Sequence, residues 1–348
     1  DFEKGDVSAQ IQKLYFEGSF RSFIFSLGRQ PLFWGQSFVN PLLIGDSAQN
    51  MDMLRLSTKP VRWGSFLKYL GDLRADFFLS KMEKDRVTPR EWFMGWRVGL
   101  MPTKDIEINF SYLYQFGGEG IPDIDWLEFM FELIGTRLKR SKDDEVGSDQ
   151  TNRSGSMDFR WKFLDGQWPS SFYMEHHLED CCGTLKVVLE KSYSYLYGFE
   201  ILAKELWGQP LLQFEYVKTT FALYRHHRWR SGLSRLKVLM GHPIGRDSQG
   251  FYAFVKSTAF RRWSFGLSLL WEEILRTGRS GDTYYLDKST RAVSEKHWGL
   301  SPSIEWNFNP RYRVDTQLAM IFIKDREFQK SSTELEWMLG LRFHADIF

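Results

Sequence analysis

Hydrophobic and polar positions alternate strictly over residues 297–309. The apolar set consists of Trp298, Leu300, Pro302, Ile304, Trp306 and Phe308, and the intervening residues are small or polar. A β-strand directs successive side chains to opposite faces, so this pattern predicts a strand with one wholly apolar face. Such a face needs cover, either from the dry core of a β-sandwich or from lipid.

The same alternation recurs along most of the chain, at residues 92–100, 106–116, 195–203, 263–271, 312–322 and 335–343. Each run has about 9–13 residues, the length that a tilted strand needs to cross a bilayer. Aromatic residues make up 17% of the sequence and gather near the ends of the runs, as in the interface girdles of membrane barrels. We therefore predict that the runs are membrane-crossing strands.

The connections between these runs alternate in length. The short ones cover about residues 17–19, 101–104, 165–169, 207–210, 260–262 and 309–310, and the long ones cover about 29–50, 117–154, 180–193, 220–248 and 276–296. Tight turns at one end and long loops at the other are typical of outer-membrane barrels. A sandwich has no such regular alternation, so the pattern favours lipid as the cover.

The predicted fold is all-β, a transmembrane antiparallel outer-membrane β-barrel of about 16–18 strands that forms one domain over residues 1–348. We identify about fifteen runs, an odd number. If both termini lie on the periplasmic side the number must be even, so one strand is missed or precedes Asp1. The terminal Phe348 also fits an outer-membrane barrel, although it is out of phase with the face formed by residues 343–347.

Two segments, 60–71 and 121–140, carry apolar residues at helical spacing instead. In the second, Trp126, Phe129, Met130 and Leu133 fall on one stripe. Non-strand backbone at membrane depth is tolerated where it packs on protein or lines the lumen. We therefore expect the second helix to fold into or over the mouth of the barrel. With residues 29–50 and 117–154 as plug or lid loops, the lumen is expected to be closed.

Composition excludes several classes of function. The net charge of +2 gives no sign of nucleic-acid binding, and no run of 18 apolar residues predicts a helical membrane span. Cys181 and Cys182 are adjacent and cannot form a disulfide framework. There is no glycine-rich phosphate loop and no spaced set of metal ligands, so we predict no cofactor and no metal. In the segment 175–180, Glu175 and His177 face the lumen and His176 faces away, which argues against catalysis.

Three long-loop segments carry distinctive motifs. The first is "RQPLFWGQSFVNPLLIGDSAQN" (29–50), the second is "QFGGEGIP" (115–122), and the third runs from "YRHHRWRSG" to "GHPIGRDS" (224–248). In their order and spacing they resemble the Wzi capsule-assembly family, and the likeness covers about residues 10–348. Phe33-Trp34-Gly35 stands for the family's aromatic pair and glycine, whereas Gln36-Ser37 departs from its Pro-Gly.

The resemblance implies an eighteen-stranded outer-membrane barrel closed by loops and helices. It also implies a lectin-like protein, not an enzyme, that binds capsular or surface polysaccharide and assists its assembly or anchoring at the cell surface. Its expected partners are capsular polysaccharide or exopolysaccharide, outer-membrane lipid and lipopolysaccharide, and other capsule-export proteins. The N-terminal periplasmic helical element of some members has no counterpart in the sequence as we interpret it.

Sugar binding needs aromatic faces for pyranose rings, and arginine or lysine for acidic sugars. The predicted polysaccharide-binding residues are therefore Arg225, His227, Arg228, Trp229, Arg230, Trp34 and Arg29. The extracellular loop 220–248 carries the first five, while Trp34 and Arg29 are more easily explained by packing of an inward-folded plug. Gly35, Gly117, Gly118, Glu119 and Gly120 are predicted to be plug residues, with positive-φ glycines and a Glu119 that pairs with a lumen arginine.

Other hypotheses remain open at this stage. The loop 224–230 can instead bind phosphate groups of lipopolysaccharide, or bind no ligand. The barrel can instead be a diffusion or export channel, an enzyme acting on lipid or glycan, or a structural partner in an envelope complex. Whether residues 29–50 and 117–154 fold inside and close the lumen distinguishes the first of these from the anchor hypothesis.

Overall fold

The computed structural model describes residues 11–62, 64, 69–121, 124–133, 151–179, 193–226, 228–260, 262–275, 294–309 and 311–345. The strands of the large sheet are β1 (Leu14–Phe20), β2 (Phe23–Gln30), β3 (Met51–Thr58), β4 (Val61–Arg62), β5 (Asp72–Lys81), β6 (Trp92–Thr103), β7 (Ile106–Phe116), β8 (Thr151–Leu164), β9 (Ser170–Glu179), β10 (Tyr193–Leu202), β11 (Leu211–Lys218), β14 (Ser248–Phe260), β15 (Trp263–Leu275), β16 (Ser294–Asn309), β17 (Tyr312–Lys324) and β18 (Thr333–Ala345). The short pair β12 (Ser234–Arg235) and β13 (Val238–Leu239) forms a separate ribbon, and the helices are α1 (Trp126–Leu133) and the short 3-10 helix η5 (Arg326–Phe328).

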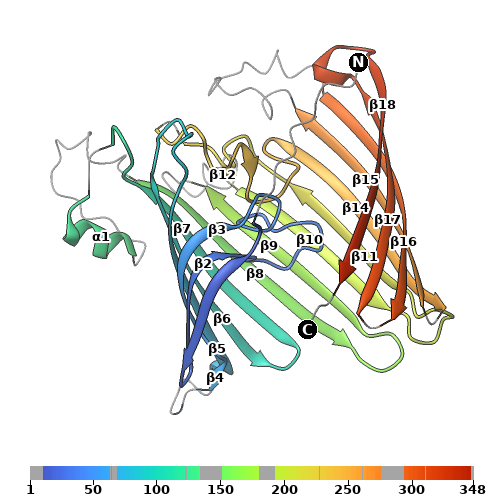
Figure 1. Cartoon of the computed structure of the whole chain (residues 1–348), viewed down its shortest axis with the longest axis horizontal. Coiled ribbons are helices and arrows are strands. Elements are labelled where there is room, and N and C mark those ends of the chain that lie inside the picture. The colour runs from blue at the N-terminus through green and yellow to red at the C-terminus, as the bar shows by residue number, and fades with distance from the viewer. Residues whose placement is uncertain are drawn as a thin grey trace.

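Among the residues that the structure describes, the large sheet has sixteen strands, and each is antiparallel to its neighbour along the path from β1 to β18. Fifteen strands lie on this path in chain order, and β4 pairs with β5 beside it. Figure 1 shows the tilted strands wrapped around an interior, with β1–β3 in front, β8–β11 behind and β18 to the right. A 13-residue register between β17 and β18 joins Tyr312 to Ala345 and Lys324 to Thr333.

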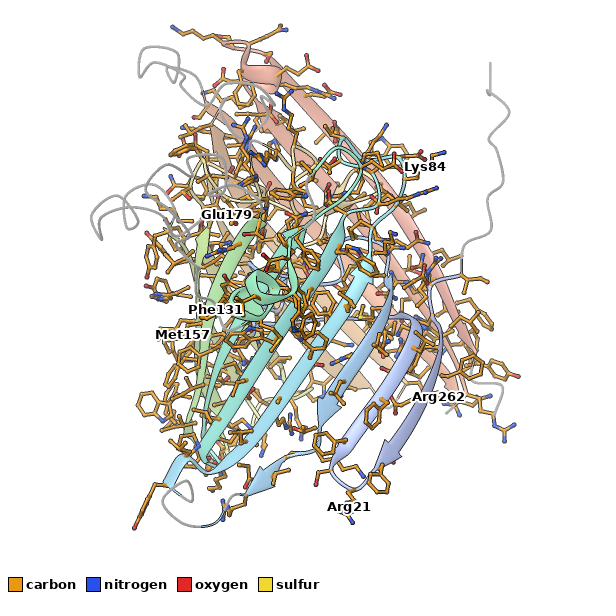
Figure 2. The ribbon with its side chains drawn as sticks, turned by 90° about the vertical axis from the view of Figure 1, so that its left-hand side faces the viewer. Arg21, Lys84, Phe131, Met157, Glu179 and Arg262 are labelled. Atoms are coloured by element: carbon orange, nitrogen blue, oxygen red, sulfur yellow. The ribbon has the colours of Figure 1, made fainter. Side chains whose placement is uncertain are left out.

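The two ends of the sheet differ as the sequence predicts. Short connections such as 21–22, 104–105 and 165–169 lie at one end, called the short-turn end below. The connections 31–50, 82–91 and 219–247 lie at the other, the long-loop end. Figure 2 shows Arg21 at the first end and Lys84 at the second. One predicted turn is wrong, because residues 17–19 are inside β1 and the chain reverses at 21–22.

The exposure of the strands is the reverse of that in a water-soluble sheet. On β16 the outward Leu300 and Ile304 are 39% and 43% exposed, and on β7 Phe110 is 43% exposed. On the opposite face of β7, Asn109 and Gln115 are buried. Apolar side chains therefore face out of the curved sheet and polar side chains face in, which is the arrangement of a membrane-spanning barrel.

The helix α1 lies outside the curved sheet, beside β7 (Figures 1 and 2), where its Phe129 ring is 5.7 Å from Phe116. The helical spacing from 126 is confirmed, but its expected place in or over the mouth is wrong. An apolar stripe needs an apolar surface, and the outer face of β7 offers one. No helix among the described residues is long and apolar enough to span a membrane. Of the other predicted helical segment, 60–71, residues 61–62 form β4, and residues 63 and 65–68 lie outside the described residues.

The apolar core lies within the curl of the sheet. It combines residues 31–50, which we call the plug, with residues 219–247, which we call the cap loop. Leu43 and Ile44 of the plug pack with Leu223 and Met240 of the cap loop, and inward-facing Phe78 of β5 completes the cluster on the wall side. Residues 29 and 30 of the predicted plug loop belong to β2.

Candidate functional site

Two wall carboxylates hold the plug from below. Glu175 of β9 accepts hydrogen bonds from the backbone N–H groups of Gln36, Ser37 and Leu42, the last two at 2.9 and 2.8 Å. Glu215 of β11 accepts from the Ser37 hydroxyl at 2.8 Å and from the N–H of Phe38 at 3.2 Å. The plug has little regular structure, so its buried amides need such acceptors.

Gly35 lies where the plug comes closest to β9. Its φ is +157°, and a Cβ built on it would lie 2.4 Å from the Oε1 atom of Glu175. Any larger residue would therefore push the carboxylate away from the amides it binds. The neighbouring Trp34 is 2% exposed and donates from Nε1 to Asp76 of β5 at 2.9 Å.

The cap loop covers the plug on the long-loop side. The Tyr224 hydroxyl donates to the carbonyl of Leu42 and accepts from the N–H of His242 at 2.7 Å. The N–H of Gly45 donates to the carbonyl of Met240 at 2.7 Å. Burial raises the pKa of Tyr224 well above 10, so this hydroxyl stays protonated and keeps its role as a donor.

The connection 82–91 fixes the cap loop from the side. The Arg86 guanidinium is buried, pairs with Glu91 at 2.7 Å and donates to the carbonyls of Gly232, at 2.8 Å, and Ser234. Burial raises the pKa of Glu91 to about 7, against the opposing effect of Arg86. Together these contacts tie the cap loop to the 82–91 connection.

The structure places the two predicted sugar-stacking tryptophans in the interior. Trp229 is fully buried, and its Nε1 donates to the carbonyl of Gly117 at 3.3 Å. Trp34 is equally inaccessible. Direct sugar contact by either ring is therefore contradicted by the structure, and both rings serve packing. The sequence of a basic loop motif does not show whether an aromatic side chain in it faces solvent or the interior.

Arg29 does not pack in the plug. It lies on the face of β2 opposite to the buried Ser26 and Gln30, and it binds Asp52 through two hydrogen bonds of 3.0 and 2.7 Å. The Arg235 guanidinium of the cap loop is 3.8 Å from the same carboxylate. The predicted plug contact is wrong for Arg29 because residue 29 still belongs to β2, where alternation directs its side chain outward.

The glycines after β7 adopt the backbone conformation expected of them. Gly117, Gly118 and Gly120 have φ values of +58°, +102° and +87°. Glu119, by contrast, pairs at 3.7 Å with Arg90, and both side chains are more than half exposed. The expected partner, a lumen arginine, is therefore wrong. The partner lies on the surface of the 82–91 connection.

Four of the five arginines of the cap loop remain at least partly accessible, whereas Arg235 is buried. Arg230 is exposed, Arg225 and Arg228 are half-buried, and His227 lies outside the described residues. Arg246, which was not singled out as a site residue, lies close enough to Arg225 for the second cation to help burial lower its pKa to about 10. The closeness of these two arginines in space is not predictable from the sequence, because 21 residues separate them. The cap loop thus gathers positive charge at the long-loop end.

The histidine and carboxylate segment of β9 is oriented as the alternation predicts. His176 faces outward, where its ring lies 5.2 Å from Tyr193 and 5.6 Å from Tyr197. Glu175 and His177 face the interior, where Glu175 is occupied by the plug. No group of three or more histidine, cysteine or acidic residues that could hold a metal occurs within the described residues.

A family model for the capsule assembly protein Wzi matches residues 3–321. The chain belongs to this family. Among solved structures it is similar to Escherichia coli Wzi, described as an outer-membrane carbohydrate-binding β-barrel involved in group 1 capsule assembly. The TM-score is 0.72 and the identity 20%, over 94% of this chain and 69% of that one. It is also similar to Pseudomonas aeruginosa OccD3, with a TM-score of 0.52 and 10% identity, over 93% and 74% of the two chains.

A curated relative is an uncharacterized 55.8 kDa protein of the Klebsiella pneumoniae cps region, 27% identical over 167 residues. The match covers 46% of this chain and 31% of that protein, so it spans less than a third of the relative's length. The Wzi family and the outward apolar faces place the chain in the outer membrane. The predicted outer-membrane β-barrel fold and the family resemblance are confirmed.

Proposed function

We propose that this barrel binds an acidic capsular polysaccharide or exopolysaccharide at its long-loop end and assists its assembly or anchoring, without catalysing a reaction. The observation that carries the proposal is the combination of a plug packed inside the curled sheet with accessible arginines above it. Arg225, Arg228, Arg230 and Arg246 occupy the cap loop, which is itself held by the plug. The description of Escherichia coli Wzi as carbohydrate-binding supports the same conclusion.

The chemistry fits an acidic polymer. Arginine pairs with carboxylates in a bidentate geometry, and several cations on one loop bind successive charged units of a chain. Because the tryptophans are buried, affinity is expected to come from charge more than from stacking. Binding should therefore weaken as salt rises, since exposed charges are screened over about 8 Å at physiological ionic strength.

A binding experiment with matched variants tests the proposal. Purified protein in detergent is titrated with polygalacturonate. Arg228→Ala/Arg230→Ala should weaken binding about tenfold or more, since hydrogen bonds between charged groups contribute about 1.5–3 kcal/mol each. Lys104→Gln is the control, because Lys104 is exposed at the short-turn end with only surface carboxylates nearby. Equal loss in both variants would point to nonspecific charge and oppose the proposal.

Two further measurements separate the competing functions. If the barrel is an anchor with a closed lumen, planar bilayers containing the protein stay silent, whereas steady openings would favour a channel. Purified lipopolysaccharide competing with polygalacturonate for the same arginines would favour contact with lipid phosphate groups. Association with other capsule-export proteins is part of the proposal and is tested by co-purification from the outer membrane.

A further inference from the structure

A cavity of about 470 Å³ lies beneath the plug, on the side opposite to the cap loop. Its walls come from residues near the short-turn ends of the strands, including Lys59 after β3 and Arg74 near the start of β5. Its roof is formed by plug residues 33–36. The volume is in the range of small-molecule sites, which span about 300–1,000 Å³. The cavity therefore lies toward the short-turn end of the lumen, with the plug above it.

The charges of this cavity are unbalanced. Arg55 is neutralised by Asp76 through two hydrogen bonds of 2.8 and 2.6 Å, and Arg97 pairs with Asp158 at 2.7 Å. The remaining cations are Lys59 and Arg74, which are exposed and have no ion pair within the described residues.

The remaining carboxylate of the lining, Glu107, accepts a hydrogen bond from Asn109 at 3.0 Å. With the two ion pairs cancelled, Lys59 and Arg74 stand against Glu107, and the lining carries an excess of one positive charge that favours an anion.

An aromatic ring stands beside these cations. Phe33 is 45% exposed and lines the cavity, whereas the residues on either side of it, Leu32 and Trp34, are buried. No ring contact of Phe33 is found among the residues that the structure describes. An exposed phenyl ring within a polar lumen offers an apolar face. Ser57, on β3, adds a hydroxyl to the same lining.

The combination selects a class of ligand. A carboxylate or phosphate satisfies the cations, but neither uses the ring. A pyranose has an apolar face of C–H groups that packs on an aromatic ring, together with hydroxyls for polar partners. A uronic acid unites both parts in one ring.

We propose that this cavity is a second saccharide site, specific for a uronic acid unit, with the carboxylate on Arg74 and Lys59 and the sugar face on Phe33. The site faces the periplasmic side of the plug and is separated from the cap-loop arginines by the plug itself. It is independent of the proposed polymer site, because the two share no residue. A glycan at this position contacts the barrel before, or without, reaching the cell surface.

The experiment uses the full chain carrying Arg228→Ala/Arg230→Ala, so that binding at the cap loop does not mask the cavity. Digalacturonate is titrated by calorimetry, with maltose and inorganic phosphate as comparison probes. Saturable binding of digalacturonate is expected, with maltose at least tenfold weaker. Adding Arg74→Gln or Phe33→Leu should each weaken digalacturonate at least tenfold. Phosphate should bind weakly and should be insensitive to Phe33→Leu.

Lys104→Gln serves as the control at the same end of the barrel, and heat-modifiable electrophoretic mobility shows that each variant is folded. Absence of digalacturonate binding, equal binding of maltose, or indifference to both added variants would overturn the proposal. Phosphate binding as tightly as digalacturonate would reduce the cavity to a plain anion patch and also overturn it. The effect of Arg228→Ala/Arg230→Ala on polygalacturonate binding tests the cap loop, and the effect of Arg74→Gln or Phe33→Leu on digalacturonate binding tests the cavity, so the two proposals fail separately.

Discussion

Carboxylates on the inner wall of the barrel differ in their burial and in their partners between two sides of the barrel. On the β9–β11 side, Glu175 and Glu215 are buried and accept hydrogen bonds from the backbone of the plug. On the β14–β17 side, Glu305 pairs with Lys256 at 2.8 Å and Asp315 pairs with Arg313 at 3.1 Å. These latter side chains are between 20% and 45% exposed.

The difference follows from their strand neighbours. Glu175 lies opposite Asp158 on β8 and Leu196 on β10, so neither residue directly facing it is a cation. Glu215 lies opposite Gly198 and Tyr252. A carboxylate without a cation beside it is stable while water solvates it, and burying it is costly unless hydrogen bonds replace that water. In this barrel it marks the place where loop backbone packs against the wall.

The largest effect is expected from Glu175→Ala. The change leaves three buried N–H groups of the plug without their acceptor, at about 1–3 kcal/mol for each unsatisfied group. We expect the plug to detach, and planar bilayers to show openings that the parent protein lacks. The matched control is Glu305→Ala, which removes a carboxylate from the opposite wall. Openings of the same size in both variants would show that the two walls do not differ.

Trp229→Ala tests whether the cap loop depends on packing. Removing a fully buried tryptophan is expected to cost about 3–5 kcal/mol and to free residues 219–247 from the turn at Gly117. Limited proteolysis should then cut the cap loop faster than in the parent. Trp207→Ala, which removes a 73% exposed ring at the short-turn end, should leave the cleavage rate unchanged. Unchanged cleavage in Trp229→Ala would mean that the ring is not what holds the loop.

The pH dependence of the cap loop follows from Glu91. Its pKa is raised to about 7 in the folded protein, so the folded state favours the protonated carboxyl. The stability from this group is fully present below about pH 4.5 and is lost as the pH rises through about 7. Hydrogen exchange of residues 228–235 should therefore quicken over this range after correction for the intrinsic rate. Glu91→Gln should abolish that dependence, and a dependence that survives the change would exclude Glu91 as its source.

The smallest effect is expected on the opposite wall. Lys256→Gln breaks a half-exposed pair with Glu305, and pairs of this kind contribute about 0.2–1 kcal/mol. Thermal unfolding in detergent should shift by a few degrees at most, and the lumen should stay closed. A loss as large as that of Glu175→Ala would remove the distinction between the walls.

Much of this architecture was predictable from side-chain alternation. The run from Trp298 to Phe308 predicted β16 and its single apolar face, and the alternation of short and long connections predicted that this face meets lipid. The resemblance at 29–50 pointed to the plug. The orientation of Trp229 was not predictable, since it depends on a hydrogen bond to Gly117, 112 residues away. The position of α1 outside the curved sheet was not predictable either, because its apolar stripe fits any apolar surface.

The cavity below the plug illustrates the same limit. Lys59 and Arg74 are ordinary residues near strand ends, and Phe33 is one of 30 phenylalanines. Their meeting depends on the plug folding back into the lumen. Only the tertiary structure brings the three together.

The plug contacts also set an order for assembly. The N–H of Leu42 binds Glu175, 133 residues further along the chain, and Leu42's carbonyl binds Tyr224, 182 residues further along. Closing such long stretches carries an entropic cost that must be met before the contacts form. The plug therefore cannot complete its fold until β9 and the cap loop are in place. Until then its apolar Leu42–Ile44 stretch lacks the packing partners that bury it in the folded barrel.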